Sequence, residues 1–224
     1  MARSPALPDV LCLGVCMRLY GMSASGNCWK AAQILRLTGH TFEWIETDAN
    51  SGATRTPEFL ALSPIGKIPI LVLADGTILA ESNAILLHFA ESTAWLPPAG
   101  LTRTRVHEWL FFEQYSHEPY IAVARNLMSW KREAHLHPER LRECNERGAM
   151  ALGVMERRLN GHSWLAGDTP TVAELALFAY THRADEGGFD LERWPGVLAW
   201  VARVKSLPGI STLPRPTGWP RPNV

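Results

Sequence analysis

The sequence predicts a small α/β domain followed by an all-helical domain, and two observations carry this prediction. In the first part, short apolar or β-branched runs surround one helical pattern and end in Asp75-Gly76, a strong β-hairpin signal. After the Pro/Gly-rich segment at residues 95–101, apolar residues recur at steps of three and four. That spacing turns one face of each helix toward a core.

Turn and capping residues bound the elements of the first domain. Gly21 ends a short apolar run, Gly39 ends a helical pattern, and Ser82 stands where a helix N-cap is expected. In chain order we expect a strand at Met17–Tyr20, a helix at Asn27–Thr38, a strand at Phe42–Thr47, a hairpin of Ile70–Leu73 with Thr77–Leu79, and a helix at Ala84–Ala90.

The second domain contains a long amphipathic pattern at Arg140–Asn160, which Gly161 ends. Thr171 and Glu174 have capping-box spacing before a helix at Leu175–Tyr180, and one or two shorter helices are expected between residues 194 and 207. We therefore divide the chain into an extension at 1–16, an α/β domain at 17–94, a linker at 95–101, a helical domain at 102–213 and a proline-rich tail at 214–224.

The charge balance argues against a nucleic acid partner. The chain carries 22 basic and 22 acidic residues, and neither domain has the basic excess that a phosphate backbone requires. No run of about 18 apolar residues exists that would span a membrane. His135 and His137 precede a proline in a loop-like segment without a third ligand nearby, so we expect no metal.

The cysteines form neither a CxxC pair nor a zinc-site spacing, and they number four: Cys12, Cys16, Cys28 and Cys144. Their number and scatter favour a reducing cytoplasm over a secreted disulfide framework. The apolar run at residues 10–16 resembles a signal peptide only loosely, because no small-residue cleavage site follows it. We expect residues 1–16 to be a dispensable extension of a cytoplasmic protein.

Three local features of the first domain stand out, and the two at helix starts are consistent with binding of a small anion. Ser25-Gly26-Asn27-Cys28 lies at a strand-to-helix turn, where free N–H groups and the helix dipole favour negative charge, although Ser25 is also explained as a plain N-cap. Pro69 precedes the hairpin, where a proline removes no interior ladder bond. Glu81-Ser82 lies at the start of the next helix, with the same two interpretations.

Together and in this order, these features resemble the cytosolic glutathione transferases, specifically their serine-type, bacterial-style branch (theta-, phi- or delta-like). The resemblance covers about residues 17–213. It depends on the S-x-x-C turn, Pro64-Ile65-Gly66-Lys67-Ile68-Pro69, Glu81-Ser82-Asn83-Ala84-Ile85 and Gly167-Asp168-Thr169-Pro170-Thr171-Val172-Ala173-Glu174. It implies a thioredoxin-like domain joined to an α-helical domain, a homodimer, and a role in detoxification.

The resemblance also implies a role for each site residue. Pro69 would be a cis proline, Ile68 would pair its main chain with the cysteinyl part of glutathione, and Lys67 would reach a glutathione carboxylate. Glu81 and Ser82 would hold the γ-glutamyl end. Some members supply a histidine ahead of the Ile-Pro step, where this sequence has Gly66.

The implied function is conjugation of glutathione, as co-substrate, to small hydrophobic electrophiles. Ser25 would donate a hydrogen bond to the thiolate, and Ser23, two residues earlier, is an alternative donor. By analogy with the family, Tyr115 and Tyr120 would line the electrophile pocket. Two other functions stay open: disulfide exchange or peroxide reduction through Cys28, and a non-catalytic binding module. A packed, inert thiol is the simpler interpretation of Cys28.

Overall fold

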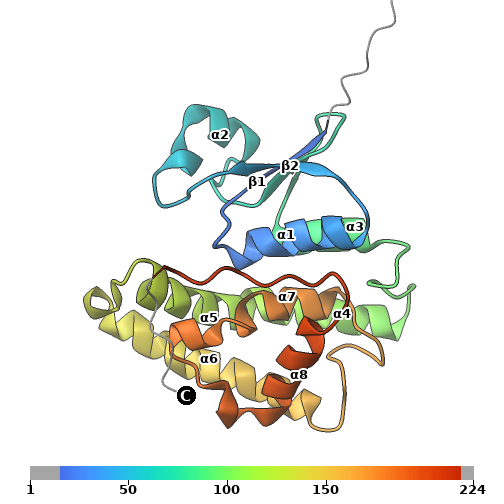
Figure 1. Cartoon of the computed structure of the whole chain (residues 1–224), viewed down its shortest axis with the longest axis vertical. Helices are drawn as coiled ribbons and strands as arrows, with labels where there is room; N and C mark the ends of the chain where they lie inside the picture. Colours follow the sequence, from blue (N-terminus) through green and yellow to red (C-terminus); the bar gives the residue numbers. More distant parts are fainter. Residues whose placement is uncertain (1–15, 218–224) are drawn as a thin grey trace, which may run out of the picture.

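The computed structural model describes residues 16–217, and within them the predicted fold class is confirmed. Figure 1 shows a small sheet with its helices above a larger layer of helices. The α/β part contains, in order, β1 (Met17–Gly21), α1 (Gly26–Leu37), β2 (Phe42–Glu46), α2 (Pro57–Leu62), β3 (Ile70–Val72), β4 (Ile78–Ala80) and α3 (Ser82–Ala90). Predictions for residues 1–15 and 218–224 lie outside the described residues.

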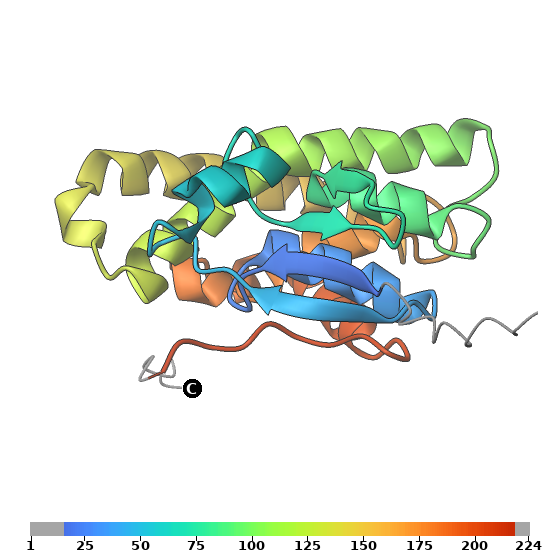
Figure 2. The ribbon, with the colours of Figure 1, turned by 90° about the horizontal axis from the view of Figure 1, so that it is seen from above.

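The sheet has four strands in the order β2-β1-β3-β4. β1 pairs parallel with β2, whereas β1–β3 and β3–β4 are antiparallel, the latter closing the predicted hairpin over Asp75-Gly76. The first two strands are joined through α1, as a parallel pair requires. The start of α1 therefore lies just after the end of a central strand, and Figure 2 shows these strands seen from above.

The helical part contains α4 (Leu101–Phe112), α5 (Glu118–Arg125), α6 (Pro138–Leu159), α7 (Val172–Thr181) and α8 (Pro195–Lys205), with a π-helical turn at Glu113–His117 between α4 and α5. The predicted capping box is present at the start of α7. The Thr171 side chain accepts from the Ala173 N–H, and the Glu174 carboxylate accepts from the Thr171 N–H at 2.6 Å.

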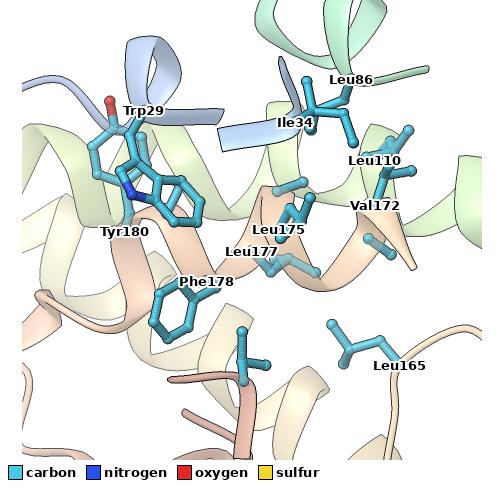
Figure 3. Close-up of a cluster of buried hydrophobic side chains, with 14 of the residues drawn as sticks. Trp29, Ile34, Leu86, Leu110, Leu165, Val172, Leu175, Leu177, Phe178 and Tyr180 are labelled. Carbon is cyan, nitrogen blue, oxygen red and sulfur yellow. The ribbon is translucent and has the colours of Figure 1, made fainter. Parts of the chain in front are cut away.

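One apolar core joins the two parts. Side chains of α1 and α3, among them Ile34 and Leu86, belong to the same buried cluster as Val172 and Phe178 of α7. Figure 3 shows this packing, with α7 beneath the two helices of the α/β part. Since burial of apolar surface holds the parts together, side chains from both sides can form a common site with fixed geometry.

One local prediction was wrong, and one helix was missed. Ser82 is not the N-cap of α3 but its first residue, because Glu81 occupies the cap position with a positive φ of 66° and no capping side-chain bond. The helix α2 was not predicted at all, although Thr56 caps it by accepting from the Phe59 N–H and Pro57 stands at its first position. Within residues 16–217, no helix combines the length and the apolar character needed to cross a membrane.

Candidate functional site

The residues expected to bind glutathione surround one cavity. Lys67, Ile68, Pro69, Glu81 and Ser82 all line a space of about 390 Å³ between the two parts of the molecule. The helical part contributes Gln114 and Glu118 to its wall. A larger cavity of about 480 Å³ lies between α4 and α6, but none of the predicted site residues lines it.

The loop before β3 is held in shape from within. Ser63 Oγ accepts from the Lys67 N–H at 3.3 Å and donates to the Lys67 carbonyl at 3.1 Å. Gly66 has a φ of +61°, and a Cβ there would lie 2.8 Å from the Thr54 carbonyl oxygen, so a side chain in the place of the family's histidine would not fit without movement. The Ile68–Pro69 peptide bond is cis, as the resemblance implied.

The start of α1 contributes to the walls of two cavities: Asn27 lines the first, and Ser25 lines a second. Ser25 caps the helix, with its Oγ accepting from the Cys28 N–H at 3.3 Å. Tyr180 of α7 accepts from the Asn27 N–H at 3.2 Å, and its hydroxyl points toward this turn in Figure 3. The capping bond uses an acceptor position of the Ser25 hydroxyl, which also lies within hydrogen-bonding reach of the Tyr180 hydroxyl.

The second cavity has a volume of about 260 Å³ and meets the first at Glu118. Ser25, Ala122, Val123, Arg125 and Trp130 are among the residues that line it. The Arg125 guanidinium is buried against Glu186 at 2.8 Å and donates to the Ala24 carbonyl at 2.8 Å, which ties the loop that carries Ser25 to the helical part. The wall therefore combines apolar side chains with one buried cation, Arg125, and one carboxyl group, Glu118.

The other predicted residues lie elsewhere. Ser23 is exposed, and its N–H and hydroxyl bind Glu46, so it lines neither cavity beside Ser25. Tyr115 is 83% exposed and Tyr120 stacks against Arg140, so neither tyrosine lines these cavities. The two tyrosines were named by analogy with the family, and such an analogy does not determine which face of a helix meets the cavity, least of all beside the π-helical turn at Glu113–His117.

Cys28 has the properties of an inert thiol. Its side chain is fully buried, and burial raises its pKa to about 11 even though contacts with Ser25 and Met22 act in the opposite direction. Cys144 is buried as well. Within residues 16–217, no cluster of three or more histidine, cysteine or acidic side chains is arranged to hold a metal ion.

Two residues of the site were missed from the sequence. Asn27 Nδ2 donates to Glu118 Oε1 at 3.1 Å, and Asn27 Oδ1 accepts from the Ser82 hydroxyl at 3.3 Å. The amide is thus fixed between α3 and α5, with its side chain at the wall of the first cavity. Asn27 belongs to the S-G-N-C turn itself, a signal that could have singled it out. Glu118 carried no comparable signal.

The family model for the N-terminal domain of glutathione S-transferase matches residues 19–95, and the model for its C-terminal domain matches residues 138–203. A glutathione S-transferase-like protein of a Fusarium species is 31% identical over 196 residues, which cover 83% of this chain and 87% of that protein. The disulfide-bond oxidoreductase YfcG of Escherichia coli (strain K12) is 29% identical over 178 residues, covering 75% and 80% respectively.

Solved structures agree with these matches. The crystal structure of a glutathione S-transferase from Xanthobacter autotrophicus Py2 is 69% identical and has a TM-score of 0.87, covering 89% of this chain and 97% of that one. The structure of Ure2p in complex with glutathione is 25% identical, with a TM-score of 0.77, and covers 88% of this chain and 92% of that one.

Proposed function

This chain belongs to the glutathione S-transferase family, and we propose that it attacks small hydrophobic electrophiles with the thiolate of glutathione, which Ser25 stabilises. The observation that carries the proposal is the position of the Ser25 hydroxyl. It lies at the start of α1 and lines the second cavity, while Asn27 of the same turn lines the cavity that Lys67, Ile68, Pro69, Glu81 and Ser82 surround.

The energetic demand on Ser25 is small. A free thiol has a pKa of about 8.5, so lowering it by two units takes about 2.7 kcal/mol of preferential thiolate stabilisation. A hydroxyl hydrogen bond to an anion, together with a helix N-terminus, contributes about that much. Ser25 therefore acts as a hydrogen-bond donor, and neither as nucleophile nor as base.

Replacing Ser25 with Ala tests this role. We expect Ser25→Ala to lower the conjugation rate with 1-chloro-2,4-dinitrobenzene by about 10- to 100-fold and to raise the pKa of the bound thiol by roughly one to two units. The thiolate absorbance of bound glutathione, followed against pH, measures that shift. Ser25→Thr keeps the hydroxyl and serves as the matched control, and Ser23→Ala should behave as wild type. An unchanged pH profile in Ser25→Ala would remove Ser25 from this role.

The rest of the site supports glutathione as co-substrate. Lys67 would bind a carboxylate of the tripeptide, the main chain of Ile68 beside Pro69 would pair with its cysteinyl part, and Glu81 with Ser82 would hold its γ-glutamyl end. Each of these residues lines the cavity of about 390 Å³. Glutathione binding to Glu81→Gln by calorimetry should weaken by about tenfold if this carboxylate meets the tripeptide's ammonium group.

A second candidate function is glutathione-dependent disulfide reduction. The similarity to the disulfide-bond oxidoreductase YfcG favours it. The burial and the raised pKa of Cys28 favour a route through the thiol of glutathione rather than through Cys28 itself. Cys28→Ser should accordingly keep its activity on a mixed glutathione disulfide. If Cys28→Ser lost this activity while Ser25→Ala kept it, the mechanism through Cys28 would be supported instead.

We further propose a cytoplasmic homodimer that acts in detoxification. An apolar cavity of about 250 Å³ between α3 and α4 lies beside Phe111, which is 74% exposed, and such a surface is typical of an interface between subunits. Phe111→Glu should shift the mass measured by light scattering from dimer to monomer, whereas wild type that is monomeric at micromolar concentration would contradict the proposal.

The alternative of a non-catalytic binding module predicts glutathione binding without turnover of any electrophile.

A further inference from the structure

We propose that Glu118 carries the proton from the attacking thiol of glutathione to the group that leaves the second substrate. This inference rests on the proposed function, because it takes the thiol to lie at the start of α1. It adds a catalytic residue from the helical part, whereas the resemblance assigned catalysis to the α/β part alone.

The position of Glu118 is the first argument. It lines both the glutathione cavity and the second cavity, and no other described residue among the lining side chains is common to the two. A bond that forms between substrates held in these two cavities must form near their junction. Because Asn27 Nδ2 donates to Glu118 Oε1 at 3.1 Å, the carboxyl group is also held in a fixed orientation at that junction.

The second argument is the chemistry of the other lining groups. No histidine or cysteine is among the described residues that line the two cavities. Lys67 and Arg125 are cations, and burial raises the pKa of Tyr180 further above its ordinary value. Glu81 lines the first cavity but not the second. Glu118 is therefore the described group best able both to accept a proton and to release it at the junction.

The surroundings of Glu118 suit a proton carrier. Burial has the largest influence and raises the pKa of its carboxyl group. Lys30 of α1 lowers that pKa, Glu113 of the π-helical turn raises it, and the Asn27 amide and Lys67 lower it. A pKa above the ordinary value of a glutamate brings the carboxyl group closer to the operating pH, where proton transfer is most effective.

The step balances for a mixed disulfide as second substrate. The S–H bond of glutathione breaks and its proton moves to the Glu118 carboxylate. The resulting thiolate forms a new S–S bond, and the old S–S bond breaks with its electron pair on the leaving sulfur. That sulfur takes the proton from Glu118, which returns to the carboxylate form. One disulfide replaces another, so no outside oxidant or reductant is needed.

The test compares a leaving group that needs a proton with one that does not. The full chain and its Glu118→Gln variant are assayed on the mixed disulfide of glutathione with 2-mercaptoethanol and on 1-chloro-2,4-dinitrobenzene, from which chloride leaves unprotonated. Glutamine keeps the oxygen that accepts from Asn27 but cannot carry the proton. Exposed Glu146 of α6 supplies the matched control, Glu146→Gln.

We expect Glu118→Gln to slow turnover of the mixed disulfide about 100-fold. Turnover of the chloride compound should fall by no more than about threefold, because Ser25 still stabilises the thiolate, the thiol proton can pass to water, and chloride does not need that proton. The pH profile for the disulfide should also change. Wild type should lose activity on the disulfide at high pH, where the bound thiol has no proton left for Glu118 to carry to the leaving sulfur, and the variant should lack that decline. Thermal unfolding and glutathione affinity of the variant are measured alongside, since a folding defect would alter both.

Three results would overturn the inference while leaving the proposed function intact: an equal loss on both substrates, no loss on the disulfide, or a wild type that turns over the chloride compound alone. A wild type inactive on both substrates would instead contradict the proposed function itself.

Discussion

At the scale of single residues, Gly26 determines how near the ring of Tyr180 lies to the start of α1. A Cβ atom at Gly26 would lie 2.7 Å from a ring carbon of Tyr180, well inside van der Waals contact. The missing side chain therefore allows the Tyr180 hydroxyl to accept from the Asn27 N–H. The same contact fixes the turn on which Ser25 is carried.

The Gly26→Ala substitution tests this contact. We expect it to lower the free energy of unfolding by about 1–3 kcal/mol, since the ring or the helix must shift, and to raise the KM for glutathione. Denaturant titration and steady-state kinetics measure the two effects. Gly153→Ala in α6 is the control, because a Cβ there would lie 3.8 Å from the Arg157 side chain, an ordinary contact, and alanine is favoured over glycine in a helix interior by about 0.5–1 kcal/mol. Similar effects in both variants would contradict the interpretation.

How far the site could be predicted depends on how local each residue's partners are. Ser25, Pro69 and Glu81 lie in turns whose sequence pattern is short and continuous, so motif spacing located them. Glu118 meets Asn27 across 91 positions of the chain, and only the docking of the two parts brings them together. A sequence pattern within one helix or strand cannot reveal a contact between residues so far apart in the chain.

At the scale of elements, α1 is joined to the helical part by a fully buried ion pair. Lys30 Nζ lies 2.6 Å from Glu113 Oε1, and both side chains have no exposed surface. Asn83 of α3 bonds to both partners, at 3.3 Å and 3.0 Å. Sequence periodicity could not reveal this pair, because a lysine in an amphipathic helix is ordinarily on the solvent face.

Breaking this pair should be costly, whereas replacing it should not. Lys30→Met leaves Glu113 buried without its cation, so we expect a loss of about 3–5 kcal/mol in the free energy of unfolding. The double variant Lys30→Met/Glu113→Leu removes both charges and should recover most of that loss. Denaturant titration of the wild type, both single variants and the double variant completes the cycle. Additive losses would show that the two charges do not depend on each other.

Most other elements could be predicted from the sequence. The hairpin of β3 and β4 and the cap of α7 were predicted because a few neighbouring residues determine them. The short helix α2 was missed, since Pro57–Leu62 is too brief to show a helical period. The N-cap of α3 was misplaced by one residue because sequence alone does not reveal the positive φ of Glu81.

At the scale of the whole molecule, the segment that follows α8 ties the two parts together. In Figures 1 and 2 it runs as an extended red coil, and Figure 2 shows it along one side of the molecule. Ser211 accepts from Trp29 Nε1 of α1 at 2.9 Å, and the Leu213 N–H donates to His182 Nε2 at 3.0 Å, next to the end of α7. This anchoring requires a neutral imidazole, since a protonated Nε2 cannot accept.

The stability of the molecule should therefore depend on pH through His182. Burial is the main cause that lowers its pKa to about 3, against about 6.5 in the unfolded chain. The unfolded chain binds this proton more readily, so stability is full above pH ~6.5 and falls as the pH drops from 6.5 toward 3. His117, buried and likewise lowered to about 3, adds a second loss of the same sign.

Substituting His182 separates the two contributions. By pH 5.5, each buried histidine should cost about 1.4 kcal/mol of unfolding free energy relative to neutral pH. His182→Gln is expected to be less stable than wild type at pH 7.5 but to lose about 1.4 kcal/mol less on acidification, because glutamine does not take up the proton. Exposed His135→Gln, which lacks such burial, should follow the wild-type curve. If the free energies of unfolding of wild type and His182→Gln changed in parallel with pH, the anchoring of the segment after α8 would not depend on the charge of this imidazole.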